Sequence, residues 1–130
     1  KYEVTQMKKQ GRGGSIVNNS SLAGKIGVAD RAQYVTAKHG MLGMTKSVAL
    51  EVGKYGIRVN AVCPGTIDTP MVRRMVAGQD LNLDLVKAGV ALGRLGTVEE
   101  IAHAVLWLCS DGASYVTGEP LSVDSGVTIQ

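Results

Sequence analysis

Short apolar segments alternate with longer amphipathic ones along this chain. The segments at residues 15–19, 57–62 and 119–123 are too brief to show a period, which is typical of strands buried on both faces. Between them, apolar residues recur every three or four positions, which indicates helices. The order strand, long helix, strand, loop, helix, strand predicts an α/β fold. We expect a parallel sheet of about three strands with flanking helices.

The long helix is predicted over residues 31–54, with Gly56 as its stop. Gly40 and Gly43 each cost this helix about 1 kcal/mol relative to Ala, which suggests close approach by another helix or a ligand. Its apolar face comprises Met41, Leu42, Thr45, Val48, Ala49 and Val52.

Residues 1–10 are interpreted as the last turns of another helix, stopped by glycines. The final helix begins at Thr97, whose TVEE sequence is a capping box with Glu100. Its predicted buried stripe is Ile101, Val105 and Leu108, and Trp107 is expected in the core. The second strand is predicted to end before Cys63-Pro64-Gly65. Residues 72–95, between this strand and the final helix, are typical of a mobile loop segment that covers a site.

Composition narrows the function classes. Of 130 residues, 45% are apolar and 19% charged, as in an ordinary globular domain, and the net charge of +3 is scattered. Without a basic stripe, nucleic acid is not expected as a partner, and no apolar run reaches membrane-spanning length. Cys63 and Cys109 are expected to be reduced, buried thiols, and His39 and His103 have no ligand-spaced companions. These features favour a reducing, cytoplasmic setting without a metal site.

Candidate chemistry centres on Tyr34 and Lys38, which stand four residues apart and therefore on one face of the predicted helix. An ammonium beside a phenol stabilises the phenolate, so such a pair can transfer a proton near neutral pH. The pair alone is equally compatible with a solvated helix face. However, residues 20–21 follow the first strand and residues 64–65 follow the second. Because parallel strands end at one edge of a sheet, these residues are expected to converge there.

The chain resembles the C-terminal half of a short-chain dehydrogenase/reductase along nearly its whole length. The matching pieces are GGSIVNNSSLAG, YVTAKHGMLGMTKSVALEVGKYGIRVNAVCPG, TIDTPM, LGRLGTVEEIAHAVLWLCSD and YVTGEPLSVDSG. Tyr34-x-x-x-Lys38, a Ser thirteen residues before the Tyr and the RVNAVCPG segment are specific in combination.

The resemblance implies a role for each catalytic position. Tyr34 is implied as the general acid/base, and Lys38 as the group that stabilises its phenolate and binds the nicotinamide ribose. Ser21 is implied to hold the substrate oxygen. Ser20 is one residue from the family position, so we assign it structural hydrogen bonding at the strand end. The substrate implied is a small alcohol or ketone.

The resemblance also implies contacts with NAD or NADP. Pro64 and Gly65 would let the backbone pass close to the nicotinamide ring. Ile67, through its backbone, and Thr69, through its side chain, would bind the carboxamide, with ordinary loop packing as the alternative. The family is usually dimeric or tetrameric through the Tyr34 helix. Met41, Leu42, Thr45 and Ala49 are candidates for that interface or, equally, for the intrachain core.

Three departures from the family pattern limit this interpretation. The Gly-rich phosphate-binding turn is absent, as is the Asn that completes the family's proton relay, and Ser125 replaces the first Gly of Asp-Gly-Gly, where a left-handed turn is expected. Residues 1–130 are therefore expected to be the C-terminal catalytic part of one domain whose N-terminal dinucleotide-binding half is absent. We predict an NAD(P)-dependent oxidoreductase, with this chain inactive alone. The alternatives are a non-catalytic fragment or remnant, and a related lyase or epimerase.

Overall fold

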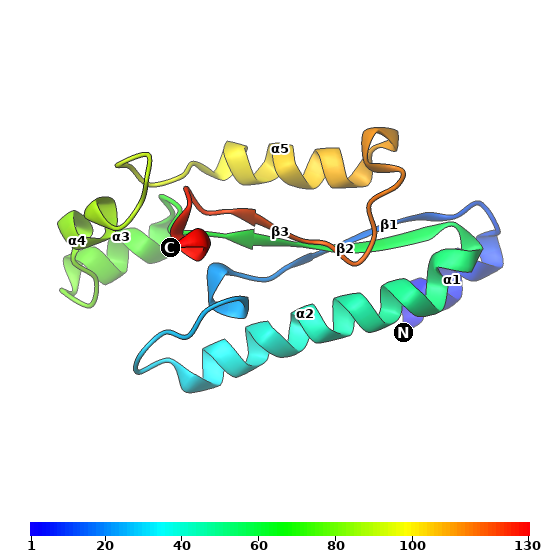
Figure 1. Ribbon diagram of the computed structural model, residues 1–130, viewed down its shortest axis with the longest axis horizontal. Helices are drawn as coiled ribbons and strands as arrows, with labels where there is room; N and C mark the ends of the chain where they lie inside the picture. The colour runs from blue at the N-terminus through cyan, green and yellow to red at the C-terminus, as the bar shows by residue number, and fades with distance from the viewer.

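The computed structural model describes residues 1–130 and contains one parallel sheet with helices on both faces (Figure 1). The strands are β1 (Gly14–Asn19), β2 (Ile57–Pro64) and β3 (Pro120–Val123), arranged in the order β1-β2-β3. The predicted α/β class with three parallel strands is confirmed. The helices are α1 (Tyr2–Gln10), α2 (Ala32–Val52), α3 (Pro70–Ala77), α4 (Leu83–Ala88) and α5 (Val98–Cys109).

Strand β2 is the centre of the molecule, since it pairs with both neighbours and most of its own residues are buried. It extends two residues beyond the predicted range, to Pro64. A proline fits this last position because the N–H of Gly65 continues the ladder, donating to the carbonyl of Val123 at 3.0 Å.

Helix α2 covers one face of the sheet, while α5 covers the other (Figure 1). Two apolar clusters lie between α2 and β2. One comprises Ala49, Val52, Ile57 and Val59, and the other Leu42, Ala61 and Cys63. Helix α1 adds Val4 and Met7 to the first cluster.

The structure decides several features that the sequence left open on α2. Leu42, Thr45 and Ala49 are buried within the chain, so they belong to its core and not to an outward face, while Met41 is half-buried. No atom of another segment would lie within 4 Å of a Cβ added to Gly40 or Gly43. The close approach expected at these two glycines therefore does not occur within this chain.

Helix α5 begins with the predicted capping box, in which Thr97 and Glu100 bind each other's backbone N–H. Its stripe buries Leu108, but Trp107 is 43% exposed, so its expected place in the core is wrong. Cys109 is also exposed, whereas Cys63 is buried. The cause is geometric: successive helical residues point about 100° apart, so the neighbours of an inward Leu108 turn toward the sides.

The segment predicted to be an excursion contains α3 and α4, which lie beyond the carboxyl ends of β2 and β3 (Figure 1). Thr69 caps α3, and Asn82 caps α4. This segment therefore stands at the edge of the sheet where the candidate site lies. None of the helices combines the length and the apolar character needed to cross a membrane.

Candidate functional site

Tyr34 and Lys38 lie on the first turns of α2, close to the end of β1. The Lys38 ammonium donates to the carbonyl of Asn19 at 3.0 Å, which ties the helix to the strand end. The same nitrogen lies 5.6 Å from the centroid of the Tyr34 ring. Tyr34 is 47% exposed, and its hydroxyl makes no hydrogen bond within the chain. The phenol is therefore free to meet a ligand beside a cation whose position is set by backbone.

The two serines after β1 use their hydroxyls differently. Ser20 is 4% exposed and donates its hydroxyl proton to the carbonyl of Lys38, at 3.2 Å. This structural role agrees with the expectation for Ser20, although its partner is in α2. Ser21 starts the 3₁₀ turn Leu22–Gly24, which we call the Ser21 turn, and its oxygen accepts from the N–H of Ala23 at 3.1 Å. That bond leaves the Ser21 hydroxyl proton available to a ligand.

Gly65 has a packing role that the sequence did not reveal. A Cβ added there would lie 2.8 Å from the Cα of Asp124, a backbone atom that cannot easily move. Any larger residue would therefore push β2 and the end of β3 apart. Gly65 was expected to make room for a nicotinamide ring. Within the chain, its contact with Asp124 already requires a glycine at this position.

Ile67 and Thr69 both keep hydrogen-bonding groups free. The segment around Ile67 pairs with Gly96, through bonds from Gly96 N–H to Thr66 and from Asp68 N–H to Gly96. Neither the N–H nor the C=O of Ile67 takes part, and both lack partners in the chain. The Thr69 oxygen accepts from the N–H of Val72 at 3.3 Å, which leaves its hydroxyl proton free. A primary carboxamide, with two donors and one acceptor, fits this set of groups.

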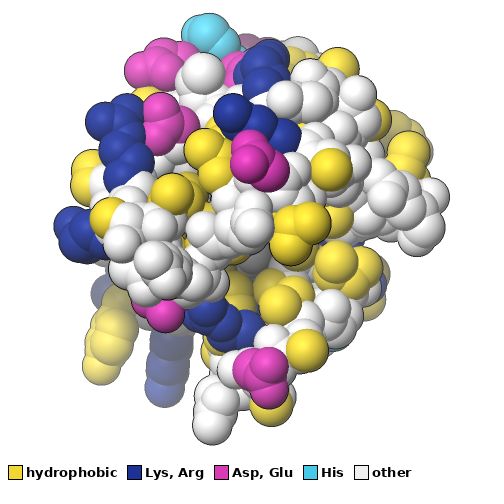
Figure 2. Space-filling view, turned by 90° about the vertical axis from the view of Figure 1, so that its left-hand side faces the viewer, with side chains coloured by type: hydrophobic (Ala, Val, Ile, Leu, Met, Phe, Trp, Pro, Cys, Tyr) yellow, Lys and Arg dark blue, Asp and Glu magenta, His cyan; other side chains and the backbone are white.

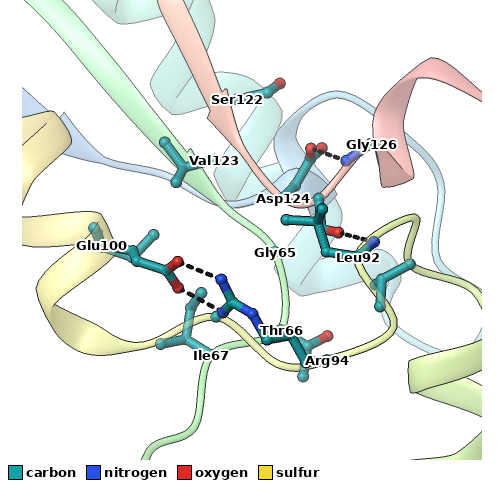
Figure 3. A pocket seen from close by; sticks show the side chains of 14 residues that line it. Gly65, Thr66, Ile67, Leu92, Arg94, Glu100, Ser122, Val123, Asp124 and Gly126 are labelled. Carbon is teal, nitrogen blue, oxygen red and sulfur yellow. Dashed lines mark hydrogen bonds and ion pairs between the residues drawn. The ribbon is translucent and has the colours of Figure 1, made fainter.

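A cavity of about 290 Å³ opens at the carboxyl ends of β2 and β3 (Figure 3). On one side, Arg94 forms a double ion pair with Glu100, with a shortest contact of 2.7 Å. These bonds, together with one from the N–H of Thr97, lower the pKa of Glu100 to about 2. The lining also includes Gly65, Thr66, Ile67 and residues 122–126, but none of Ser21, Tyr34 and Lys38.

A second hollow, of about 500 Å³, lies between α3, α4 and the start of α5. Its walls are mainly apolar, with Val72, Val76, Leu83 and Leu95 among them. Figure 2 looks onto this end of the molecule and shows apolar and charged side chains interspersed, without a continuous patch of one charge.

Sequence reasoning missed a polar group next to the Ser21 turn. The ammonium of Lys25 donates to the hydroxyl of Ser122 on β3, at 2.7 Å. Lys25 is also close enough to Cys63 for its charge to act on that thiol. Burial raises the pKa of Cys63, against the opposing effects of Lys25 and of the Ser21 backbone. The sequence pattern of residues 22–30 predicted only a loop. No spacing rule connects a lysine in a loop with a strand about a hundred residues later.

Asp124 and Ser125 form the turn that ends β3. The Asp124 carboxylate is 9% exposed and accepts bonds from the N–H groups of Gly126 and Thr128 and from the Thr128 hydroxyl. Ser125 adopts the left-handed conformation expected of the family's glycine, with φ 55°. It is held there by bonds from Leu92 to its hydroxyl and from Ala91 to its carbonyl, seen partly in Figure 3.

The sheet order and the flanking helices define a Rossmann-like α/β protein, and comparison with known proteins agrees. A family model described as enoyl-(acyl carrier protein) reductase matches residues 1–128. The chain belongs to the short-chain dehydrogenase/reductase family, as its motifs suggested.

Two relatives illustrate the similarity. A 2,5-dichloro-2,5-cyclohexadiene-1,4-diol dehydrogenase of Sphingobium indicum is 44% identical over 131 residues, covering 98% of this chain and 51% of the relative. An A-factor type gamma-butyrolactone 1'-reductase of Streptomyces virginiae is 45% identical over 127 residues, covering 98% and 49%. The chain therefore spans about half the length of these curated relatives.

Among solved structures, ElxO with NADP bound superimposes with a TM-score of 0.90 at 32% identity. The match covers 99% of this chain and 52% of ElxO. The agreement extends over all the elements described above, because almost no residue lies outside the aligned region.

Proposed function

We propose that this chain is the catalytic part of an NAD(P)-dependent oxidoreductase that interconverts a secondary alcohol and a ketone. The observation that carries the proposal is the arrangement at the end of β1. There an unpartnered Tyr34 phenol lies beside Lys38, which is anchored on Asn19, and Ser21 keeps a free hydroxyl proton. The dehydrogenase and reductase relatives, and the NADP bound by ElxO, support the same reaction class.

In the direction of reduction, Tyr34 donates its proton to the oxygen of the substrate carbonyl. The Ser21 hydroxyl donates a hydrogen bond to the same oxygen, where negative charge develops. Lys38 stabilises the phenolate that remains, from a position held by the carbonyl of Asn19. The nicotinamide cofactor supplies or accepts the hydride. In the direction of oxidation, Tyr34 takes the proton of the alcohol.

The cofactor, NAD or NADP, would lie along the edge formed by Pro64 and Gly65. Ile67 offers its free backbone groups to the carboxamide, and Thr69 offers its hydroxyl proton. Two protons of the Lys38 ammonium remain for the ribose. We expect the phosphate and adenosine contacts to come from a dinucleotide-binding half outside residues 1–130, since the relatives are about twice as long.

We also propose a homo-oligomer formed through the outward face of α2. On this face Met44 is 51% exposed and Leu50 is 87% exposed, while Gly40 and Gly43 leave open space. Such a face allows a second helix to approach closely. This set of residues differs from the predicted one, because Leu42, Thr45 and Ala49 point into the core.

The proposal is tested by replacing Tyr34 with Phe in the full protein. Loss of the proton donor should lower kcat by about 10²–10⁴-fold. The Kd for NADH and NADPH, measured by fluorescence titration, should stay unchanged because the aromatic ring is retained. Turnover at the wild-type rate would remove Tyr34 from the mechanism.

The second candidate function is a non-catalytic remnant that keeps the fold, since the cavity at the carboxyl ends of β2 and β3 is lined by none of Ser21, Tyr34 and Lys38. Titrating residues 1–130 and the full protein with NADPH separates the two. Turnover and binding by the full protein, with neither in residues 1–130, would support the catalytic-part proposal. Micromolar binding by residues 1–130, equivalent to about −8 kcal/mol, would show that the other half is not needed.

A further inference from the structure

A hydrogen-bonded series of four side chains connects the Ser21 turn with the end of β3. The Lys25 ammonium donates to Ser122 at 2.7 Å, and the Ser122 and Thr128 hydroxyls are 3.1 Å apart. The Thr128 hydroxyl then donates to the Asp124 carboxylate at 2.6 Å. Because an ammonium can only donate and a carboxylate can only accept, each hydroxyl accepts from the Lys25 side and donates toward Asp124.

Both ends of this hydrogen-bonded series of side chains are held in place. Lys25 directly follows the Ser21 turn, and its N–H donates to the carbonyl of Leu22 at 2.8 Å. The turn itself cannot move freely, since Ala23 and Gly24 are buried. At the other end, Asp124 is nearly buried and accepts two backbone N–H bonds. Bonds with ionised partners are shorter and stronger than neutral ones, and here both terminal groups are charged.

Lys25 and Asp124, the two ends of this series of side chains, belong to different parts of the proposed site. Lys25 is four residues from Ser21, which would hold the substrate oxygen. Asp124 packs against Gly65, where the nicotinamide would lie, at a distance that excludes a Cβ. The separation between the two parts determines how the carbonyl carbon faces the hydride donor. A misplacement of about 1 Å can cost about a hundredfold in rate.

We propose that Lys25 is a positioning residue, which sets the Ser21 turn relative to the cofactor edge through Ser122, Thr128 and Asp124. This inference rests on the proposed function. Lys25 does not touch the reacting atoms; it acts through Ser21. The same contact explains why a loop between β1 and α2 carries a half-buried lysine whose charge is directed into the molecule.

The test compares Lys25→Met and Ser122→Ala in the full protein, which break the same contact from opposite ends. Lys46→Met is the matched control, because Lys46 is exposed and its ammonium forms no hydrogen bond or ion pair in the chain. Reduction of 2,3-butanedione with NADPH, or of another small ketone if the wild type prefers it, supplies kcat. Hydrogen exchange of residues 20–26 reports the order of the turn without requiring activity.

Both test variants should lose about ten- to a hundredfold in kcat with an unchanged Kd for NADPH, and should exchange faster at residues 20–26. Lys46→Met should match the wild type in each measurement. Adding Lys25→Met to Ser21→Ala should cause no further loss, because a residue that acts through Ser21 has no effect once Ser21 is removed.

Three results would overturn the inference. A loss in Lys25→Met but not in Ser122→Ala would mean that Lys25 acts on the substrate directly. Additive losses in the double variant would mean that it does not act through Ser21. Unchanged hydrogen exchange in both variants would mean that the contact does not order the turn. If the wild type reduces no ketone, the proposed function fails instead, while the exchange measurement still tests the contact.

Discussion

The polar groups on the amino half of β2 and those on the segments around its carboxyl end differ in whether they have partners within the chain. In the amino half, Arg58 donates to the carbonyls of Leu108 at 2.7 Å and Ser110 at 3.1 Å, at the end of α5. Asn60, fully buried, donates to Val116 and accepts from Glu119. Every one of these polar groups has a partner in the chain.

Around the carboxyl end, several polar groups have none. The Tyr34 phenol, the Ser21 hydroxyl proton and the backbone groups of Ile67 make no hydrogen bond within the chain. The polar groups on the amino half of β2 therefore contribute to stability, whereas those on the segments around its carboxyl end lack partners in the chain at the place where we propose that a ligand binds. Open parallel sheets place ligands at the carboxyl ends of their strands, where loops leave backbone groups unpaired. The predictions below test whether the two roles are separable.

The largest effect on stability is expected at Asn60. Asn60→Leu removes both bonds from a fully buried position. It leaves the Glu119 N–H without this partner and the Val116 carbonyl with only the 3.5 Å bond from Arg58, which should lower the free energy of unfolding by about 2–4 kcal/mol. Denaturant unfolding measures the loss. The kcat of the fraction that folds should be close to wild type.

Asn18→Ala is the control, since Asn18 is half-buried and makes a single side-chain bond, to Thr45. Its loss should be smaller than that of Asn60→Leu. A large fall in kcat for Asn60→Leu, with stability retained, would contradict the division of β2 into a structural half and a functional end.

A middle-sized effect is expected at Gly65, where both roles meet. Gly65→Ala forces the added Cβ against the backbone of Asp124, which should cost about 1–3 kcal/mol in unfolding free energy. It should also weaken NADPH binding, because the turn after β2 must shift. Unfolding and fluorescence titration measure the two effects.

Gly43→Ala is the opposite case, because nothing within the chain lies within 4 Å of the added methyl group. In the middle of α2, an alanine should stabilise residues 1–130 by up to about 1 kcal/mol. If Gly65→Ala and Gly43→Ala both raised the free energy of unfolding, the contact between Gly65 and Asp124 would not exclude a larger residue.

The smallest effect concerns pH and the ion pair beside the cavity. Arg94 and the Thr97 N–H lower the pKa of Glu100 from 4.5 to about 2. A carboxyl whose pKa falls on folding stabilises the folded state above its unfolded pKa. This contribution should therefore be complete at neutral pH and should be lost as pH falls from about 4.5 to 2.

Thermal unfolding across that pH range measures the effect. Glu100→Gln should flatten the acid dependence slightly, because the Glu100 side chain is 41% exposed and solvent screens its ion pair with Arg94. Glu99→Gln, at an exposed neighbour without an ion pair, is the control. An acid dependence that is identical in Glu100→Gln and the wild type would show that the pair contributes nothing measurable.

Sequence patterns were most reliable where one local rule decides the structure. The capping box at Thr97 and Glu100 follows from hydrogen-bonding preferences that need no distant partner. Gly56 is left-handed as a stop requires, although α2 already ends at Val52 and Gly56 ends the 3₁₀ turn Gly53–Tyr55 that follows it. The distinction between Ser20 and Ser21 came instead from the family resemblance, and the bond from the Ser20 hydroxyl to Lys38 agrees with the structural role expected for Ser20. The functional motifs benefited from local rules, because Tyr34 and Lys38 are fixed by helical spacing alone.

Patterns failed where exposure depends on what packs nearby. Trp107 and Cys109 were expected in the core because they are apolar, but α5 directs Leu108 inward and leaves its neighbours at the side. Gly40 and Gly43 indicated a close approach that does not occur inside this chain. An apolar or small residue shows only that burial is favourable, not which segment provides it.

By itself, the sequence determined the order of strands and helices along the chain, the helix carrying Tyr34 and Lys38, and the family, since each depends on local periodicity or on motifs in a fixed order. Only the tertiary structure decided that Lys25 reaches Ser122, that Gly65 must be small because of Asp124, and that the predicted apolar face of α2 packs on its own sheet. These contacts join residues up to about a hundred positions apart. Their distance is set by how β2 and β3 pair and how α2 packs on them, which no single segment encodes.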